Sequence, residues 1–355
     1  MINKKVYQIA ETSTDGMHAG TKATSDIKNI LDDNGVNSLI IRTPEHSKNI
    51  LKKFIRQLKY LRQWRQLYKS IEDESILVLQ HPFYLRQLGR YKILSKLKNL
   101  KKVKIISIVH DVGQLRGLFN NKFNQTEFNQ MIGLADVLIV HNETMKNWFI
   151  EQGIPSEKLF VLEIFDYLTD KDLVTSETFE KVISIAGNLS KEKSPYIYKL
   201  KDIENLNITL LGINYKGDNP ANNIKYIGAF PADEVPFQLN DGFGLVWDGD
   251  SVESCTGNTG NYLRYNNPHK LSLYLSSGLP VIVWNESAEA DFVRKNKVGF
   301  TVNSLGEITD IFKKMSLDEY LDYQKNAIQV GSKLQYGYYT NKVIESAIDY
   351  LRLDN

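Results

Sequence analysis

Residues 266–283 read NNPHKLSLYLSSGLPVIV, a short helix-like segment that leads directly into an apolar strand. Pro268 suits the first turn of a helix, and Gly278 with Pro280 ends that helix before the strand begins. The positive N-terminus of such a helix and the ammonium group of Lys270 both attract a diphosphate. The segment therefore predicts a nucleotide diphosphate site at the beginning of a helix in an α/β fold.

The rest of the chain repeats this alternation of short apolar runs and helical segments, which is typical of parallel sheets covered by helices. Because 355 residues exceed a usual single core, we expect two Rossmann-like α/β domains that face each other across a cleft. The expected domains are residues 1–165 and 181–335, and a C-terminal helix within residues 336–355 is expected to pack back across them. The expected strands lie near residues 6–10, 38–42, 76–80, 103–109 and 137–140, and near 182–186, 208–211, 224–227, 243–247 and 280–283.

The composition is that of an ordinary globular protein, with 42% hydrophobic and 24% charged residues. The N-terminal residues lack an apolar signal core, and no run of about 18 apolar residues occurs, so we expect a cytoplasmic protein without a membrane span. The single cysteine, Cys255, has no partner for an intramolecular disulfide, and no His/Cys cluster has zinc-ligand spacing. We therefore expect no structural metal.

The formal charge of +2 conceals a basic region, because residues 48–104 contain 16 Lys or Arg and only three acidic residues. Within it, residues 48–69 place apolar and basic residues at helical spacing, which predicts a basic amphipathic helix. Its apolar positions either pack on the sheet or form a surface for anionic lipid, a subunit partner or a protein substrate. No nucleic-acid-binding motif accompanies the charge, so nucleic acid is not an expected partner. The apolar positions are Leu51, Phe54, Ile55, Leu58, Leu61, Trp64 and Tyr68.

A loop that contains two glycines, residues 11–22, follows the first expected strand. Gly16 and Gly20 let a ligand approach the backbone closely, and free N–H groups at the start of the next helix favour an anion. The spacing matches neither GxGxxG nor GxxxxGK[ST], which disfavours NAD and ATP as ligands. The loop is either a structural turn or, with His18 and Thr21, an acceptor loop that closes over substrate at the cleft.

His110 and Asp111 follow a strongly apolar strand and so are expected at the mouth of the cleft. Either side chain could accept a proton from a sugar hydroxyl, although Asp111 could equally cap the next helix. Arg116 is expected to pair with Asp111 or to contact the acceptor.

The strand–turn segment at residues 186–191 reads AGNLSK. Its backbone N–H groups near Gly187 and Asn188, together with Lys191, could form a second part of a diphosphate site, and a plain turn is the alternative. In the polar loop that starts at Asp248, Asp248 and Asp250 could instead hold a divalent metal. Because Lys191, Lys270 and a helix N-terminus already neutralise the diphosphate, we expect no metal and no cofactor.

These segments resemble the GT-B glycosyltransferases, and within them the family of glucosyltransferases that add the second sugar to O-GlcNAc-modified serine-rich repeat adhesins of streptococci and lactobacilli. The resemblance spans nearly the whole chain. It is carried by AGTKATSDI at 19–27, SIVHDVGQLR at 107–116, AGNLSK at 186–191, GFGLVWDG at 242–249 and NNPHKLSLYLSSGLPVIV at 266–283.

The resemblance implies a UDP-sugar donor, with UDP-glucose as the expected one, and a GlcNAc-modified serine-rich repeat protein as the acceptor. It implies that Lys270 and Lys191 bind the diphosphate and that the backbone near Asn188 and Leu271 lies beside the nucleotide. It also implies Tyr215 as a candidate contact to uracil or ribose, and a homo-oligomer, expected to be a tetramer. The chain departs from the wider GT-B class in one respect, because residues 267–275 contain no acid and hence no Glu-x7-Glu pair.

Two other interpretations remain open at this point. A non-catalytic GT-B relative could act as a chaperone or acceptor-recognition subunit, but Lys191 and Lys270 argue against it. The chain could also be another two-domain sugar-nucleotide enzyme, such as an epimerase, or a transferase that acts on a lipid-linked or polysaccharide acceptor. The basic helix at residues 48–69 is compatible with a lipid acceptor and with peripheral membrane contact. The donor hexose, the linkage and the stereochemical outcome are not determined by the sequence.

Overall fold

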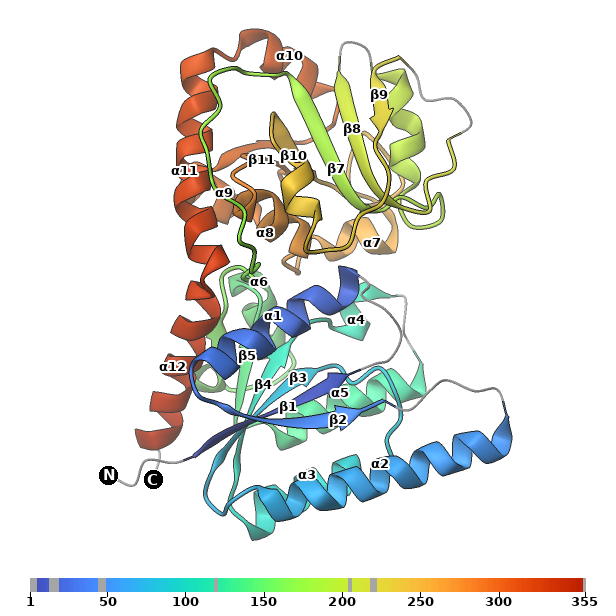
Figure 1. The fold of residues 1–355 in the computed structure, drawn as a ribbon, viewed down its shortest axis with the longest axis vertical. Helices are drawn as coiled ribbons and strands as arrows, with labels where there is room; N and C mark the ends of the chain where they lie inside the picture. Colours follow the sequence, from blue (N-terminus) through green and yellow to red (C-terminus); the bar gives the residue numbers. More distant parts are fainter. Residues whose placement is uncertain are drawn as a thin grey trace.

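The computed structural model describes residues 5–12, 19–43, 49–117, 121–203, 206–217 and 222–353, and it contains two sheets stacked along the long axis of the molecule (Figure 1). The strands of the first sheet run in the order β2-β1-β3-β4-β5-β6, and those of the second in the order β12-β11-β10-β7-β8-β9. All the pairings between described strands are parallel. Both orders are those of doubly wound sheets, which confirms the predicted pair of Rossmann-like domains. The exact limits of the two domains stay a prediction.

The first sheet and its helices account for the described residues before 162. Its strands are β1 (Val6–Thr12), β2 (Asn37–Arg42), β3 (Ile76–His81), β4 (Lys104–Val109), β5 (Val137–Val140) and β6 (Leu159–Val161). The helices are α1 (Ala19–Asp33), α2 (Ile50–Ser70), α3 (Arg90–Leu100), α4 (Gly113–Arg116), α5 (Lys122–Leu134) and α6 (Glu143–Glu151), followed by the 3-10 turn η1 (Ser156–Lys158).

The second sheet begins at residue 182. Its strands are β7 (Val182–Asn188), β8 (Asn207–Ile213), β9 (Ile224–Tyr226), β10 (Phe243–Val246), β11 (Val281–Trp284) and β12 (Gly299–Val302). The helical elements are η2 (Pro195–Asp202), η3 (Val235–Gln238), α7 (Gly257–Tyr262), α8 (His269–Ser276), α9 (Ala290–Asn296), α10 (Glu307–Lys314), α11 (Leu317–Gln335) and α12 (Tyr338–Leu353).

The predicted strands are present because their apolar runs are buried on both faces of each sheet. In β3, Leu77 and Leu79 are fully buried, as are Ile105 in β4 and Ile183 in β7. The sequence analysis missed β6 and β12, which are the last strands at one edge of each sheet. Both are short and only partly buried, so their apolar pattern is too brief to identify a strand.

The helix in the segment 266–283 begins one residue later than predicted. Pro268 has extended backbone angles and caps α8, so the first helical residue is His269. The helix ends as predicted: Gly278 has a φ of 81°, which a residue with a side chain rarely adopts, and β11 follows directly.

The C-terminal helices pack across both halves, as predicted (Figure 1). Helix α11 packs against α8 in the second half, whereas α12 packs against α1 and β6 in the first half. The buried carboxylate of Asp166 accepts hydrogen bonds from the N–H groups of Tyr339 (3.2 Å) and Thr340 (2.6 Å) at the start of α12. Burial raises the pKa of Asp166 to about 6. No helix in the described part of the chain is both long and apolar enough to cross a membrane.

Helix α2 packs on the domain with only part of its apolar residues, and not with the whole set as the packing interpretation expected. Only Tyr60, Trp64 and Leu67 of this helix are buried. The apolar positions in its N-terminal half, which include Leu51 and Phe54, are exposed to solvent. The apolar residues therefore form two separate faces, and only one of them covers the sheet.

Candidate active site

The carboxyl edges of the two sheets face each other, so the loops that follow their strands meet between the halves. Helix α4 follows β4, helix α7 follows β10, and the two helices are in contact (Figure 1). The N–H group of Val112 donates to the hydroxyl of Tyr262 at 3.1 Å. A Cβ atom on Gly117, which has a φ of 66°, would lie 3.3 Å from the side chain of Asn258. The loops after β4, β7 and β10 are therefore the natural place for a site, since ligands of doubly wound sheets bind at this edge.

Asn267 joins the two halves beside this edge. Its N–H group donates to Nδ1 of His141, and its Nδ2 donates to the carbonyl oxygens of His141 and Glu163, each at 2.9 Å. Its Oδ1 accepts from Nδ2 of Asn142 at 2.8 Å. The second ring nitrogen of His141 donates to the carbonyl of Val109, and burial lowers the pKa of His141 to about 4. Asn267, which belongs to the segment 266–283, thus forms a fixed junction between the two halves, and this junction orients α8.

The first half contributes Asp111 to the site. Its Oδ2 forms an ion pair with Nη1 of Arg116 at 2.7 Å and accepts a hydrogen bond from the hydroxyl of Tyr84 at 2.9 Å. Asp111 and Arg116 are both partly buried. Tyr84, Asp111, Arg116 and Asn124 line part of a cavity of 210 Å³ that opens beside the carboxylate. A carboxylate held in this way beside a cavity can accept a proton from a hydroxyl group placed there.

The imidazole ring of His110 is held by Gln80 and Phe165. Its Nε2 lies 2.8 Å from the amide oxygen of Gln80, so this nitrogen carries the proton. The ring stacks on Phe165, with centroids 5.3 Å apart. Burial, reinforced by the nearby His141, lowers the pKa of His110 to about 3. His110 is therefore neutral at physiological pH and already engaged through one ring nitrogen.

The second half contributes Lys270 at the start of α8. Its ammonium lies 3.2 Å from Oδ1 of Asp248 and 3.4 Å from the carbonyl oxygen of Trp247. A Cβ atom on Gly187 would lie 3.4 Å from Cε of Lys270, and Gly187 has a φ of 132°. The turns after β7 and β10 and the first turn of α8 therefore converge on one lysine.

The turn after β7 is ordered by its own polar groups. Oδ1 of Asn188 accepts from the N–H of Ser190 at 3.1 Å and from Nδ2 of Asn214 at 3.2 Å. Tyr215, two residues beyond β8, is close to Tyr198 and Tyr226, with ring centroids 5.7 and 4.9 Å away. Leu271 is buried, and its N–H donates to the carbonyl of Pro268 at 3.0 Å.

Two lysines follow this turn, and the structure distinguishes them. Lys191 is exposed, and its charge helps to lower the pKa of the neighbouring Glu192. Lys193 is still accessible to solvent but lies among the charges of the site. Partial desolvation and the nearby Lys270 lower the pKa of Lys193, whereas Asp248 and Asp111 act to raise it. Of these two lysines, Lys193 is the one that lies near the other charged groups of the site, and the sequence analysis did not single it out.

The two acids of the loop after β10 have different neighbours. Asp248 pairs with Lys270. The carboxylate of Asp250 lies beside Gly257, where an added Cβ atom would meet its Oδ2 at 2.5 Å. No group of three or more His, Cys, Asp or Glu side chains with metal-site geometry occurs among the described residues. Asp248 is therefore already paired with a lysine in this structure.

The predicted acceptor loop is described only in part. Gly16 and His18 lie outside the described residues, and Gly20 and Thr21 lie in the first turn of α1. Lys22, the next residue, pairs with Asp26 at 2.7 Å and with Asp233 of the second half at 2.9 Å. The start of α1 is therefore attached to the second half beside the junction.

Comparison with known proteins agrees with this architecture. The family described as "Glucosyltransferase 3-like, N-terminal domain" matches residues 6–164, and "Glucosyltransferase 3-like, C-terminal domain" matches residues 183–347. The chain belongs to the glucosyltransferase 3-like family. It is thus a glycosyltransferase, as the sequence analysis expected.

Two curated relatives illustrate the range of this family. The glycosyltransferase is 35% identical over 289 residues to a β-1,6-galactofuranosyltransferase of Escherichia coli, a match that covers 80% of this chain and 82% of the relative. It is 28% identical over 281 residues to Glucosyltransferase 3 of Streptococcus gordonii, covering 79% of this chain and 80% of the relative.

Solved structures share the GT-B fold with this glycosyltransferase. Anabaena HepE in complex with UDP and glucose superposes with a TM-score of 0.58 at 12% identity, covering 97% of this chain and 99% of that one. Sucrose-phosphate synthase of Thermosynechococcus elongatus superposes with a TM-score of 0.63 at 10% identity, covering 99% of both chains.

Sequence reasoning placed Asp111 and Gly187 at the ends of strands and Lys270 at the start of a helix. The structure pairs Asp111 with Arg116 in the first half and brings Gly187 close to Lys270 in the second. Sequence reasoning missed Tyr84, Lys193 and the pairing of Asp248 with Lys270. The only signal for Lys193 was a second lysine in the segment NLSKEK. Tyr84 had no signal, because the loop after β3 carries no recognised motif.

Proposed function

We propose that this glycosyltransferase moves a hexose from a UDP-sugar to a hydroxyl group held beside Asp111. The observation that carries the proposal is the convergence of charges from both halves between the two sheets. Lys193 of the second half lies within electrostatic range of Lys270 and also of Asp111 and Arg116 of the first half. Cations on one side suit a diphosphate, and a carboxylate on the other suits an acceptor hydroxyl.

The donor site is proposed to lie on the second half, around the first turn of α8. Lys270 would bind the diphosphate together with the N-terminus of α8 below Pro268, and the backbone of Gly187 would let the diphosphate approach. The backbone near Asn188 and Leu271 would lie beside the nucleotide. Tyr215, in its cluster of aromatic rings, is the proposed contact to uracil or ribose.

A second cation is proposed to bind the diphosphate together with Lys270. The resemblance points to Lys191, whereas the charges around the site favour Lys193. The variants Lys191→Ala and Lys193→Ala therefore form a matched pair in the same loop. A greater loss of UDP affinity in Lys193→Ala supports Lys193, the lysine favoured by the surrounding charges. A greater loss in Lys191→Ala supports Lys191, the lysine implied by the resemblance.

Asp111 is proposed as the catalytic base that accepts the acceptor proton. Arg116 would keep this carboxylate oriented and could also contact the acceptor, and Tyr84 fixes the same oxygen. His110 is proposed as a positioning residue, because it is neutral and its Nε2 proton is engaged by Gln80. The loop containing Gly16, His18, Gly20 and Thr21 is the proposed acceptor loop.

Two substrate pairs are proposed for testing. The resemblance favours UDP-glucose as the donor and a GlcNAc-modified serine-rich repeat glycoprotein as the acceptor. The 35% identity to a galactofuranosyltransferase favours a second candidate, in which galactofuranose is transferred to a lipid-linked or polysaccharide acceptor. The exposed basic helix α2 is compatible with the second pair.

A donor-hydrolysis screen tests the proposal first. We expect release of UDP from one of UDP-glucose, UDP-galactose, UDP-galactofuranose and UDP-GlcNAc. Mass spectrometry of a GlcNAc-peptide and of a lipid-linked GlcNAc, each incubated with the accepted donor, then identifies the acceptor class. If no nucleotide sugar is bound or hydrolysed, the proposal fails and the chaperone or acceptor-recognition role is favoured.

The proposed assembly is a homo-oligomer, expected from the resemblance to be a tetramer. Light scattering of the purified full chain measures its mass in solution and tests this expectation separately from activity.

A further inference from the structure

Helix α2 carries two apolar faces, and the protein covers only one of them. Leu67 is buried on the covered face, whereas Leu51 lies about 160° away from it around the helix axis. No residue between 50 and 59 is buried, so this half of the helix rests little on the domain. We call its five exposed residues the α2 apolar face. They are Ile50 (83% exposed), Leu51 (67%), Phe54 (60%), Ile55 (44%) and Leu58 (45%).

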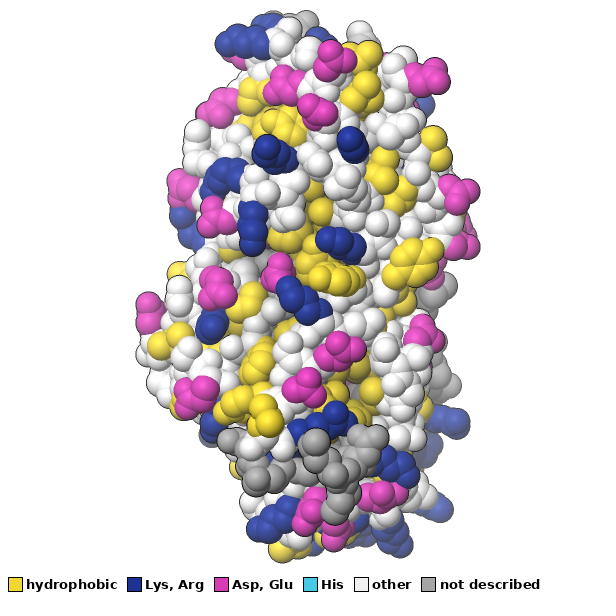
Figure 2. Space-filling model, turned by 90° about the vertical axis from the view of Figure 1, so that its left-hand side faces the viewer, with side chains coloured by type: hydrophobic (Ala, Val, Ile, Leu, Met, Phe, Trp, Pro, Cys, Tyr) yellow, Lys and Arg dark blue, Asp and Glu magenta, His cyan; other side chains and the backbone are white. Residues whose placement is uncertain are grey.

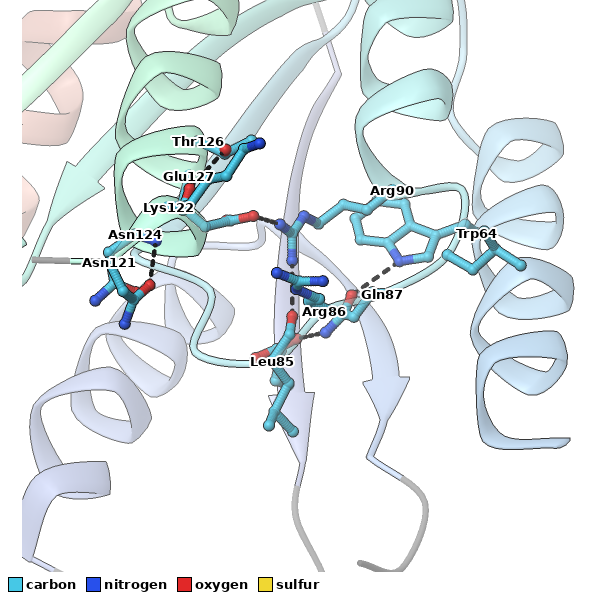
Figure 3. Close-up of polar contacts among 12 residues, drawn as sticks. Trp64, Leu85, Arg86, Gln87, Arg90, Asn121, Lys122, Asn124, Thr126 and Glu127 are labelled. Atoms are coloured by element: carbon cyan, nitrogen blue, oxygen red, sulfur yellow. Dashed lines mark hydrogen bonds and ion pairs between the residues drawn. The ribbon is translucent and has the colours of Figure 1, made fainter. Parts of the chain in front are cut away.

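The loop between β3 and α3 extends this exposed surface. Gln57 of α2 donates to the carbonyl of Arg86 at 3.0 Å and accepts from the N–H of Leu88 at 2.9 Å. Leu85, Leu88 and Tyr91 beside these contacts are exposed. The loop is also attached to the buried face of α2, because Nε1 of Trp64 donates to Oε1 of Gln87 at 2.9 Å (Figure 3). Helix and loop therefore form one continuous surface.

This surface carries charge of one sign. The sequence of α2 contains Lys52, Lys53, Arg56, Lys59, Arg62, Arg65 and Lys69, and no acidic residue. A hollow of 520 Å³ beside the loop is lined by Arg86, Lys92 and Lys122, among other residues. Arg90 and Glu127 also line this hollow. The charge of Arg90 is neutralised by Glu127, because the two side chains form a buried ion pair (Figure 3). Elsewhere, for example on the face that carries the C-terminal helices, acidic and basic side chains are interspersed (Figure 2).

We propose that α2 and residues 84–91 dock this glycosyltransferase on an anionic lipid surface. The apolar face would enter the boundary between headgroups and acyl chains, and the surrounding lysines and arginines would contact the anionic headgroups. A contact of α2 against α2 of a second copy fits this surface poorly, because it would bring seven cations of each helix into proximity with no carboxylate on either. The proposal does not rest on the identity of the donor or on the catalytic assignments.

Vesicle flotation of the full chain tests this proposal. We expect binding to vesicles of phosphatidylcholine with phosphatidylglycerol, weaker binding to phosphatidylcholine alone, and release of the protein by high salt. Each cation near an anionic membrane contributes about fivefold to affinity, so Arg62→Gln/Arg65→Gln/Lys69→Gln, three exposed positions on the side of the helix that carries the apolar face, should weaken binding about 100-fold. Leu51→Asp/Phe54→Asp should reduce binding by at least as much, because two large apolar side chains lose their burial in the lipid.

Two exposed apolar residues far from this surface supply the matched control. Val174 is 74% exposed and Leu317 is 43% exposed, and Val174→Asp/Leu317→Asp should leave vesicle binding unchanged. The α2 positions make no buried contact, so all variants should keep the circular dichroism spectrum and the UDP-sugar hydrolysis of the original protein.

Three results would overturn the proposal. The first is absence of binding to anionic vesicles. The second is equal binding to neutral and anionic vesicles that is insensitive to the substitution of Arg62, Arg65 and Lys69. The third is a fall in oligomeric mass in Leu51→Asp/Phe54→Asp with no change in lipid binding, which would identify the α2 apolar face as a subunit interface instead.

Discussion

Replacement of Lys270 by alanine should weaken UDP binding by about 30- to 1000-fold. Lys270 lies in the first turn of α8, and its side chain is only 21% exposed, so a diphosphate bound there would be partly shielded from water. Truncation of a cation that pairs with a desolvated anion costs about 2 to 4 kcal/mol, which gives the stated range. The same variant should lose a similar factor in kcat/KM if the contact persists in the transition state.

The ion pair with Asp248 adds a second effect that can be separated from the first. In Lys270→Ala, the carboxylate of Asp248 loses its partner at 3.2 Å and would repel the incoming diphosphate. The double variant Lys270→Ala/Asp248→Asn removes this repulsion and should recover about 1 kcal/mol, or about fivefold in affinity. Asp248→Asn alone should bind UDP at least as tightly as the original protein.

Isothermal titration calorimetry with UDP measures these affinities directly, and circular dichroism checks that the variants are folded. Lys225→Ala, at an exposed position in β9, is a suitable control for the general loss of one positive charge. Near-normal UDP affinity in Lys270→Ala would refute the donor-site assignment. Weaker binding in Asp248→Asn would show that this carboxylate helps to bind the donor instead of opposing it.

Three further predictions test the acceptor side, the role of metal and the junction. Asp111→Asn should keep UDP affinity but lower kcat by about 10²- to 10⁴-fold at saturating donor, and unchanged turnover would exclude Asp111 as the base. Because Asp248 is already paired with Lys270, turnover should persist in EDTA, and a loss restored by Mn²⁺ would make Asp248 and Asp250 ligands. His141 titrates at about 4 in the folded protein and near 6.5 when unfolded, so its stabilising effect is full above pH 6.5 and is lost as the pH falls towards 4. The stability advantage of the original protein over His141→Asn in urea unfolding should therefore shrink by about 2 kcal/mol between pH 7 and 5, and a constant difference would contradict the buried neutral state.

The sequence by itself determined the class of fold and predicted the main donor segment. Buried parallel strands need long apolar runs on both faces, so each central strand was visible as a short uninterrupted segment. The run from Pro268 to Pro280 combines a helix start, a helix end and a strand start, and each is set by the backbone preferences of proline and glycine. Asp111 could be placed at the cleft because ligands of parallel sheets bind where the strands end, and Lys270 could be placed at the start of a helix because Pro268 precedes it.

Only the tertiary structure decided which side chains share a site. Lys191 and Lys193 differ by two positions in a turn, and only the folded loop shows that Lys193 lies near Lys270 and Asp111. Likewise, the helical period of α2 identifies its apolar residues but does not show which of its faces the domain covers. Asn267 was part of a predicted donor segment, yet its hydrogen bonds to His141 join the two halves. These choices depend on contacts between residues far apart in the chain, which local periodicity and backbone preference do not specify.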